Sequence, residues 1–291
     1  MTRQPGVARR AEELLDSSVV ATAPVAGGDI STATRLRLSN GTTALMKTLP
    51  HPPERFFAAE AAGLRWLGEV EGGVPVPAVL ASDDECVIIE WVEQSAKHTP
   101  DTASTFGRQL AATHRAGWEG TEEGAFGWDH DGFIGRLPMP NRPCATWPEF
   151  YAIRRVLPYL RVARDRGSIT PGDAAAVESV IGRLADLLPE EPPARLHGDL
   201  WGGNCLWTVD AVHLVDPAAY CGHRETDLAM LGLFGLPHLQ RVLTAYDEAW
   251  PLADGWEERL GVHQLFPLLT HAAMFGGGYG VRAAEVARRY T

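Results

Sequence analysis

The chain has 291 residues, of which 45% are hydrophobic and 22% charged, so it can bury one large core or two smaller ones. Its net charge of -11 argues against a nucleic-acid partner, because a phosphate backbone requires a basic face. No apolar stretch of about 18 residues occurs, so no membrane span is expected. The amino terminus lacks a secretory signal and the four cysteines form no C-x-x-C pair, so we expect a cytoplasmic protein with reduced thiols.

The first 92 residues carry strand patterns with few helices. Apolar alternation predicts strands, and apolar residues at helical spacing between proline-rich breaks predict helices. The expected elements are a short helix over Arg9–Leu15, a hairpin over Val25–Leu38, a strand over Ala44–Leu49, a helix over Glu54–Val70 and a buried strand over Cys86–Val92.

From about residue 94 the pattern becomes helical, apart from two short strands around Leu206 and Val212. The predicted helices are Thr102–Ala116, Trp147–Arg166, Pro171–Leu188, Thr226–Phe234, Leu236–Trp250, Trp256–Phe275 and Val281–Tyr290. We therefore expect an α+β, bilobal chain. Residues 1–92 would form a small nucleotide-binding lobe and residues 93–291 a larger helical lobe with the catalytic and substrate-binding groups, with the nucleotide in the cleft between them.

The most informative segment is Leu196–Asn204, L-H-G-D-L-W-G-G-N, which is followed by L-V-D-P-A at Leu214–Ala218. Three polar groups in it suit a kinase-type phosphoryl transfer. Asp199 would orient and deprotonate an attacking hydroxyl, while Asn204 and Asp216 would hold magnesium ions that bridge the nucleotide phosphates. The flanking apolar runs place these groups at strand ends and in loops.

Further residues would contact the substrates. Lys47 interrupts an apolar strand and Glu60 lies on the helix that follows. Each alone is typical of an exposed face, but their order ahead of the H-G-D and D-P-A motifs favours an ion pair that holds phosphate oxygens. Gly27 and Gly28 suit either a phosphate-binding loop or a plain hairpin turn. Trp201 is interpreted as a core residue or as a stacking platform for a cationic substrate.

Other residues are expected to act through the backbone or as support. Glu90, Trp91 and Val92 end the strand that joins the lobes, where backbone groups can bond an adenine edge; a simple exit from the sheet is the alternative. His197 is interpreted as packing under the loop rather than as a general base. Asp227 is expected to cap a helix or to support the catalytic loop.

The residues from Leu196 to Asn204, with V-D-P-A-A-Y-C-G-H-R-E-T-D-L-A-M-L-G-L-F-G from Val215, resemble the fructosamine kinase (ketosamine-3-kinase) family. Phe126–Asn141, Ala245–Leu252 and Leu268–Gly276 resemble further segments of that family, so the resemblance covers nearly the whole chain. The family belongs to the aminoglycoside-phosphotransferase-like branch of the protein kinase-like fold.

The resemblance implies an ATP- and magnesium-dependent kinase that phosphorylates the third-carbon hydroxyl of a ketosamine. Such an adduct forms from a sugar and an amine, commonly a protein lysine, and its phosphorylation frees the amine. The resemblance assigns the catalytic base to Asp199, the metal ligands to Asn204 and Asp216, the ion pair to Lys47 and Glu60, the adenine-binding segment to 90–92, and a substrate-side tryptophan to Trp201. A monomer is expected.

Two other functions remain open at this point. One is a kinase of another small hydroxyl compound, such as an aminoglycoside, choline or a homoserine-like metabolite, because all of these share the same motif logic. The other is a nucleotide-binding pseudokinase. The presence of Lys47, Asp199, Asn204 and Asp216 argues against a pseudokinase, because an inactive site has no chemical need for all four groups.

Overall fold

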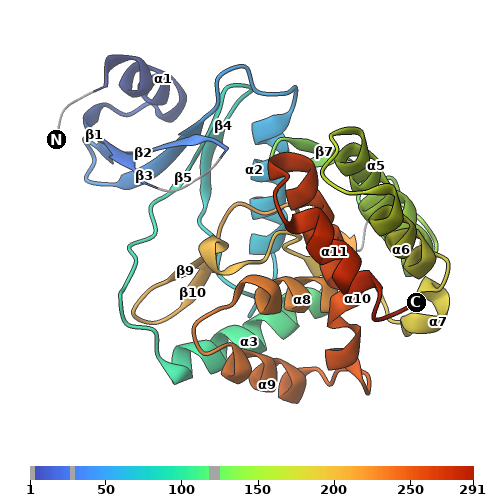
Figure 1. Cartoon of the computed structure of the whole chain (residues 1–291). Helices are drawn as coiled ribbons and strands as arrows, with labels where there is room; N and C mark the ends of the chain where they lie inside the picture. The colour runs from blue at the N-terminus through green and yellow to red at the C-terminus, as the bar shows by residue number, and fades with distance from the viewer. Residues whose placement is uncertain (1–3, 27–29, 118–124) are drawn as a thin grey trace.

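Alternating apolar residues in the first third of the chain form a five-stranded antiparallel sheet (Figure 1). The computed structural model describes residues 4–26, 30–117 and 125–291. The strands lie in the order β1-β2-β3-β5-β4, and their bounds are β1 (Val19–Val25), β2 (Thr32–Leu38), β3 (Thr43–Thr48), β4 (Val79–Ser82) and β5 (Cys86–Glu90).

One helix covers each face of this sheet. α1 (Pro5–Leu15) packs on one face and α2 (Phe56–Gly68) on the other. In β5, Ile88 joins the apolar cluster of α1, whereas Val87 and Ile89 join that of α2. Side-chain alternation therefore decides which sheet residues point toward α2.

The larger lobe is built from helices around two apolar clusters (Figure 1). α3 packs against α9, and α10 packs against α5, α8 and α11. The helical segments are α3 (Pro100–Arg115), α4 (Trp147–Phe150), η1 (Tyr151–Val156), α5 (Leu157–Asp165), α6 (Pro171–Ile181), α7 (Leu184–Leu187), η2 (Gly202–Asn204), α8 (Glu225–Phe234), α9 (Leu239–Ala249), α10 (Trp256–Phe275) and α11 (Tyr279–Ala287).

Short antiparallel strand pairs place loops at the edge of this lobe that faces the sheet. β9 pairs with β10, β8 with β11, and β6 with β7. Their bounds are β6 (Gly132–Ile134), β7 (Leu137–Met139), β8 (Ala194–Leu196), β9 (Cys205–Trp207), β10 (Val212–Leu214) and β11 (Tyr220–Gly222). The H-G-D segment follows β8 and the D-P-A segment lies between β10 and β11.

The predicted α+β, two-lobed architecture is confirmed, while the boundary proposed at residue 92 stays a prediction. Most predicted helices are present with shifted ends. All four cysteines are buried and none forms a disulfide. Within the three described ranges, no helix is long and apolar enough to cross a membrane.

Several element predictions were wrong in detail. The hairpin expected over Val25–Leu38 begins earlier, because β1 occupies Val19–Val25, and the four-residue strand β4 was not predicted. The helix expected over Pro171–Leu188 is split into α6 and α7 at Gly182 and Arg183. A four-residue strand contains too few residues for alternation of apolar and polar side chains to distinguish it from a loop.

The helix predicted over Trp147–Arg166 contains a π-helical segment, η1. Its first residue, Tyr151, is fully buried against α10. The Tyr151 hydroxyl lies 2.7 Å from the carbonyl oxygen of Val262 and 3.0 Å from that of His263, so it can donate to either, and it accepts a bond from the Phe266 N–H at 3.2 Å. Pro267 has no N–H to give to the His263 carbonyl four residues earlier, so the tyrosine replaces a helical bond that the sequence removes.

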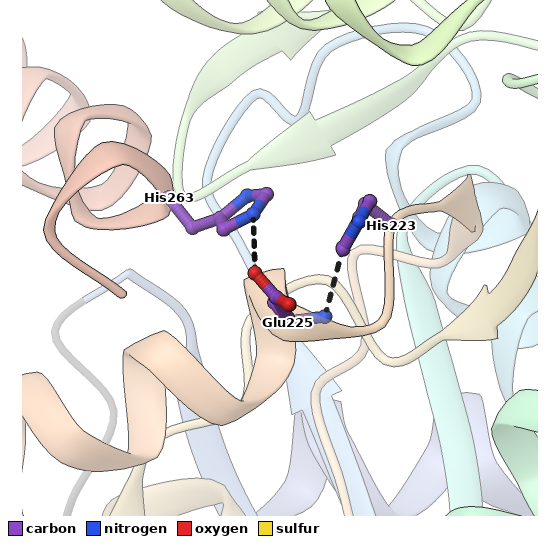
Figure 2. A group of neighbouring side chains, drawn as sticks. All are labelled: His223, Glu225 and His263. Atoms are coloured by element: carbon purple, nitrogen blue, oxygen red, sulfur yellow. Dashed lines mark hydrogen bonds and ion pairs between the residues drawn. The ribbon is translucent and has the colours of Figure 1, made fainter. Parts of the chain in front are cut away.

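A buried polar cluster of His223, Glu225 and His263 joins the start of α8 to α10 (Figure 2). The Glu225 carboxylate pairs with Arg259 at 2.7 Å and lies 3.2 Å from His263 Nε2. The Glu225 N–H donates to His223 Nδ1 at 3.3 Å, and the two imidazoles stack at 4.8 Å. Burial and the positive charges around it favour an uncharged His223. Burial opposes ionisation of Glu225, but the contacts with His263 and Arg259 outweigh it and lower the pKa of Glu225 to about 2.

The environment of His223 predicts a loss of stability on acidification. Burial, then repulsion by His263, lowers the pKa of His223 well below its ordinary value. The positive charges of Arg224 and Arg259 lower the pKa of His223 further, whereas the negative charge of Glu225 raises it. The Glu191 carboxylate lies 3.9 Å from His223 Nε2. The unfolded chain takes up a proton at this residue below a pH of about 6.5 and the folded chain does not, so the free energy of unfolding falls as the pH falls.

We expect His223→Asn to reduce that pH dependence. Asparagine keeps an acceptor near the Nδ1 position but cannot take up the proton. Urea unfolding between a pH of about 6.5 and 5 should show a slope smaller than that of the wild type by up to about 1.4 kcal/mol per pH unit. His51→Asn, at an exposed position, is the matched control and should behave as the wild type. Equal slopes for His223→Asn and the wild type would contradict the assignment.

Candidate active site

Lys47 connects the two lobes across the cleft. The alternation in β3 turns it toward α2, where its Nζ lies 2.7 Å from Glu60 Oε1. The same Nζ lies 2.8 Å from Asp216 Oδ1 of the larger lobe. Burial alone would lower the pKa of Lys47, but the two carboxylates outweigh it and raise that pKa above its ordinary value. The ammonium therefore stays charged at a position where it can meet phosphate oxygens.

The loop that follows β8 depends on a glycine at its turn. Gly198 has a φ of +80°, and a Cβ there would lie 1.9 Å from the Ala218 carbonyl oxygen. Only glycine permits so close an approach of the two backbones. The contact holds the H-G-D loop against the D-P-A segment.

The Asp227 carboxylate, at the start of α8, holds the same loop from beneath. It accepts the backbone N–H of His197 at 2.8 Å and that of Gly198 at 3.0 Å. The fully buried His114 of α3 lies 3.1 Å from the same carboxylate and 2.9 Å from the Tyr246 hydroxyl of α9. Because the Asp227 carboxylate can only accept, His114 donates a hydrogen bond to it from Nε2. His114 Nδ1 then accepts a hydrogen bond from the Tyr246 hydroxyl.

His197 is used inside the loop and does not face the cleft as a base. Its Nε2 donates to the Val215 carbonyl at 2.8 Å and its Nδ1 accepts the Asp199 N–H at 3.3 Å. Burial lowers the pKa of His197, so the ring is neutral and both nitrogens are occupied.

Asp199, Asn204 and Asp216 lie together on the wall of one cavity. The amide nitrogen of Asn204 donates to the Asp199 carbonyl at 2.8 Å and to Asp199 Oδ2 at 3.1 Å. Burial, followed by repulsion from Asp216, raises the pKa of Asp199 to about 7. Asp216 has a φ of +57°, a strained conformation for an aspartate, and such residues are enriched at functional sites.

The donor set suits a hard divalent ion such as magnesium. Since the Asn204 amide nitrogen faces Asp199, its Oδ1 is the atom that it can offer to a cation. Asp216 uses Oδ1 for Lys47 and has Oδ2 for a second partner. Oxygen ligands in small number are what magnesium accepts beside substrate phosphates.

The cavity has a volume of about 570 Å³ and lies between the lobes. The residues expected to hold the nucleotide, Leu45, Leu206 and the segment Glu90–Val92, line it. Within that segment the Trp91 N–H already donates to the Thr43 carbonyl at 3.2 Å. An adenine edge would therefore meet the Val92 N–H and the Glu90 carbonyl rather than the Trp91 N–H.

The other end of the cavity is aromatic. Trp201 is 40% exposed and lines it, with its ring 6.2 Å from that of Phe234. A Cβ on Gly203 would lie 2.2 Å from the indole, so the glycine makes room for the ring in this pose. Phe275 also lines this end, because ring contacts run from Trp201 through Phe234 and His271 to Phe275, and Trp128 lines the cavity as well.

The paired glycines Gly27 and Gly28 lie outside the described residues, so their role as a phosphate loop stays a prediction. Ala26 and Ile30, on either side, line the cavity.

Sequence reasoning missed three parts of the site. The support of Asp227 by His114 and Tyr246 was not anticipated, since no local pattern connects residues more than a hundred positions apart. The hairpin β6–β7 and the α10 residues Met274 and Phe275 line the cavity, but no chemical motif marks them. Only the resemblance of their segments to a family pointed to these regions.

The cluster of His223, Glu225 and His263 brings three ligand-type atoms within 4.8 Å of one another, but it is not arranged for a metal. Imidazole lone pairs lie in the ring planes, and the two rings are stacked with planes 30° apart, so the lone pairs do not converge on one point. Glu225 already pairs with Arg259, and its N–H occupies His223 Nδ1. The cluster is therefore a structural polar contact.

Comparison with known proteins agrees with this geometry. The family model described as fructosamine kinase matches residues 6–291. A probable ketoamine kinase of Thermus thermophilus is 37% identical over 257 residues, which cover 88% of each chain. The crystal structure of a proposed fructosamine-3-kinase from Thermobifida fusca superposes with a TM-score of 0.91 at 49% identity and covers 97% of both chains.

An ADP-bound aminoglycoside phosphotransferase superposes with a TM-score of 0.61 at 11% identity and covers 99% of each chain. At this identity the likeness shows the fold alone. The two lobes are therefore those of the protein kinase-like fold, as predicted.

The buried support of the catalytic loop yields a stability prediction. Asp227→Asn replaces one carboxylate oxygen by a donor that faces N–H groups, so we expect the free energy of unfolding to fall by about 2–4 kcal/mol and activity to fall with it. Tyr246→Phe removes the outer bond to His114 and the hydroxyl's contact with Arg224 but leaves the Asp227 carboxylate in place, so it should cost less, about 1 kcal/mol. Chemical unfolding of both variants measures this order. An Asp227→Asn protein as stable as the wild type would contradict the support role.

Proposed function

Because the chain belongs to the fructosamine kinase family and is an ATP-dependent phosphotransferase, we propose that it phosphorylates a sugar hydroxyl of ketosamines. The substrates would be fructosamine or ribulosamine adducts of small amines or of protein lysines. Phosphorylation at the third carbon would make the adduct unstable and release the amine, so that the reaction leads to deglycation.

The observation that carries this proposal is the meeting of Lys47, Asp199, Asn204 and Asp216 in one cavity between the lobes. Phosphoryl transfer needs positioning and charge stabilisation more than covalent chemistry. Asp199 orients the acceptor hydroxyl and accepts its proton. Lys47, steered by Glu60, holds the phosphate oxygens.

Magnesium, held by Asn204 and Asp216, would neutralise charge that develops on the phosphates. The backbone of Glu90 and Val92 would hold the adenine, and the Gly27–Gly28 loop would cover the phosphates. Four unpaired, buried cysteines support a reducing, cytoplasmic compartment.

The acceptor end favours a ketosamine over an aminoglycoside. Among the described residues that line the cavity, the carboxylates are Glu60, Glu90, Asp199 and Asp216, of which the first two belong to the lysine pair and the nucleotide end. A polycationic aminoglycoside needs several acidic partners, whereas the single ammonium of a ketosamine can be met by an aromatic face. Trp201 offers that face beside Asp199.

The substrate class is tested by phosphate transfer from ATP to ribulose-lysine, fructose-lysine and kanamycin, with the product position read by NMR. We expect transfer to the third-carbon hydroxyl of one or both ketosamines and little to kanamycin. Efficient transfer to kanamycin alone would favour the small-molecule kinase alternative. Binding of ATP and magnesium without turnover on any acceptor would favour a pseudokinase.

The catalytic base is tested by Asp199→Asn. Loss of the base should lower kcat by roughly 10²–10⁴ while the affinity for ATP stays close to that of the wild type. Asp210→Asn, an exposed aspartate near the same motif, is the matched control and should keep full activity. Near-normal turnover by Asp199→Asn would remove Asp199 from the mechanism.

The metal ligand is tested separately by Asp216→Asn. Because one carboxylate oxygen is lost to an amide nitrogen, we expect activity to require a much higher magnesium concentration or to vanish, with the fold retained. A magnesium titration of initial rates, with circular dichroism as the folding control, measures this. An unchanged magnesium response would reject the assignment.

A further inference from the structure

A short hairpin crosses from the larger lobe to the smaller one beside the cavity. It consists of β6 (Gly132–Ile134) and β7 (Leu137–Met139), and Gly132, Phe133, Ile134, Gly135 and Met139 all line the cavity. The Phe133 ring lies 5.1 Å from that of Phe56 at the start of α2. A Cβ on Gly135 would lie 2.4 Å from the Met274 sulfur of α10, beside Phe275 at the aromatic end of the cavity. The turn also contacts the smaller lobe, where Arg136 donates to the Ile30 carbonyl at 3.2 Å.

Strands of three residues do not hold a hairpin in place on their own. The hairpin is held by hydrogen bonds of Asn141, which is fully buried and lies two residues after β7. Its carbonyl accepts the Trp128 N–H at 2.8 Å, its N–H donates to Asp131 Oδ1 at 2.7 Å, and its amide donates to the His130 carbonyl at 3.1 Å. Asn141 thereby fixes the turn that leads into β6 and that carries Trp128 onto the cavity wall.

Asn141 is in turn held by Arg155, a fully buried arginine in the π-helical segment η1. Its Nη2 donates to Asn141 Oδ1 at 2.6 Å and its Nη1 to the Pro140 carbonyl at 2.8 Å. The guanidinium lies 3.8 Å from the centre of the Tyr220 ring and 4.6 Å from that of Phe150.

This arginine is an unusual buried charge. In the part of the chain that the structure describes, no carboxylate lies within ion-pair distance of it, so its stabilisation comes from carbonyl oxygens and aromatic faces. Burying a guanidinium is expensive, and an apolar side chain of similar volume often serves stability as well. What an apolar residue cannot do is donate to Asn141 and Pro140 at the base of the hairpin. π-helical segments also occur often at functional sites.

We propose that Arg155 is a positioning residue for the phosphoryl acceptor. Through Asn141 it fixes the hairpin β6–β7 and Trp128, which line the cavity, and the hairpin turn beside Met274 forms a wall that we assign to the acceptor. The assignment of that wall to the acceptor rests on the proposed function. The fixing of the hairpin does not, because it follows from the contacts alone.

The test compares Arg155→Met with Arg154→Met. Arg154, the preceding residue, donates to the Arg142 carbonyl at 3.3 Å and does not reach Asn141, so its variant is the matched control. Losing hydrogen bonds from a charged group costs about 1.5–3 kcal/mol, which corresponds to at least about a tenfold change in local opening. Hydrogen exchange of peptides from 126–141 should therefore be about tenfold faster in Arg155→Met, with exchange in α10 unchanged.

Activity then separates positioning from general damage. We expect the KM for the acceptor to rise about tenfold in Arg155→Met, with the KM for ATP and the affinity for ADP close to those of the wild type. A loss of active protein alone would instead lower kcat without moving either KM. Unchanged exchange in 126–141, or equal losses of acceptor and ADP affinity, would overturn the proposal.

A second variant and a measurement that does not need turnover separate a failure of this proposal from a failure of folding or of the proposed function. If Arg155→Met does not fold, Asp131→Ala removes only the bond from an exposed side chain to the Asn141 N–H. It should raise exchange in 126–141 and the acceptor KM in the same direction by about threefold, and wild-type exchange would overturn the proposal. If the wild-type enzyme phosphorylates no ketosamine, the proposed function fails, while the exchange and ADP measurements still decide the role of Arg155.

Discussion

One ammonium group shared between two carboxylates fixes the relation of the two lobes. Lys47 belongs to the sheet, Glu60 to the helix beneath it and Asp216 to the larger lobe, and all three meet within hydrogen-bond distance. Burial makes the charges of Lys47 and Glu60 costly unless they are paired, whereas the Asp216 side chain is 40% exposed and can exchange its partner. A nucleotide phosphate can replace Asp216 at Lys47, because it brings its own negative charge to the ammonium. The cleft is therefore prepared for an anion before one binds.

In the larger lobe, a polar loop is held rigid at the edge of an apolar core. The H-G-D loop has few side chains that pack, so its order comes from backbone contacts. Gly198 permits the approach to Ala218, and Asp227 accepts two N–H groups that would otherwise be buried without partners. His114 and Tyr246 extend this bonding to α3 and α9. The position of Asp199 is thus determined by helices that never contact the substrate.

How much of this could be predicted from the sequence depended on the range of the interaction. The H-G-D and D-P-A motifs identified Asp199, Asn204 and Asp216 as candidates because their spacing is local, and Lys47 and Glu60 followed from the order of strand and helix. The sheet strands were predictable from alternation, although β4 was too short to be found. His114, Arg155 and Asn141 act through partners that the chain brings together only on folding. Each looked like an ordinary buried or loop residue, and no periodicity or spacing could have set it apart.

The two ends of the cavity are built on different principles, and this bears on specificity. In the proposed assignment the nucleotide end would use backbone groups of Glu90 and Val92 together with ionic contacts, which tolerate sequence change because they need few particular side chains. The acceptor end relies on the placement of aromatic rings such as Trp201 and Phe275. A cation over a ring gains only about 0.5–2 kcal/mol, and the gain depends on the distance to the ring centre. A wall held loosely would lose most of it. The buried bonds of Arg155 and Asn141 supply the rigidity that weak, geometry-dependent contacts require, which explains why so costly a charge lies behind the wall rather than in the cavity itself.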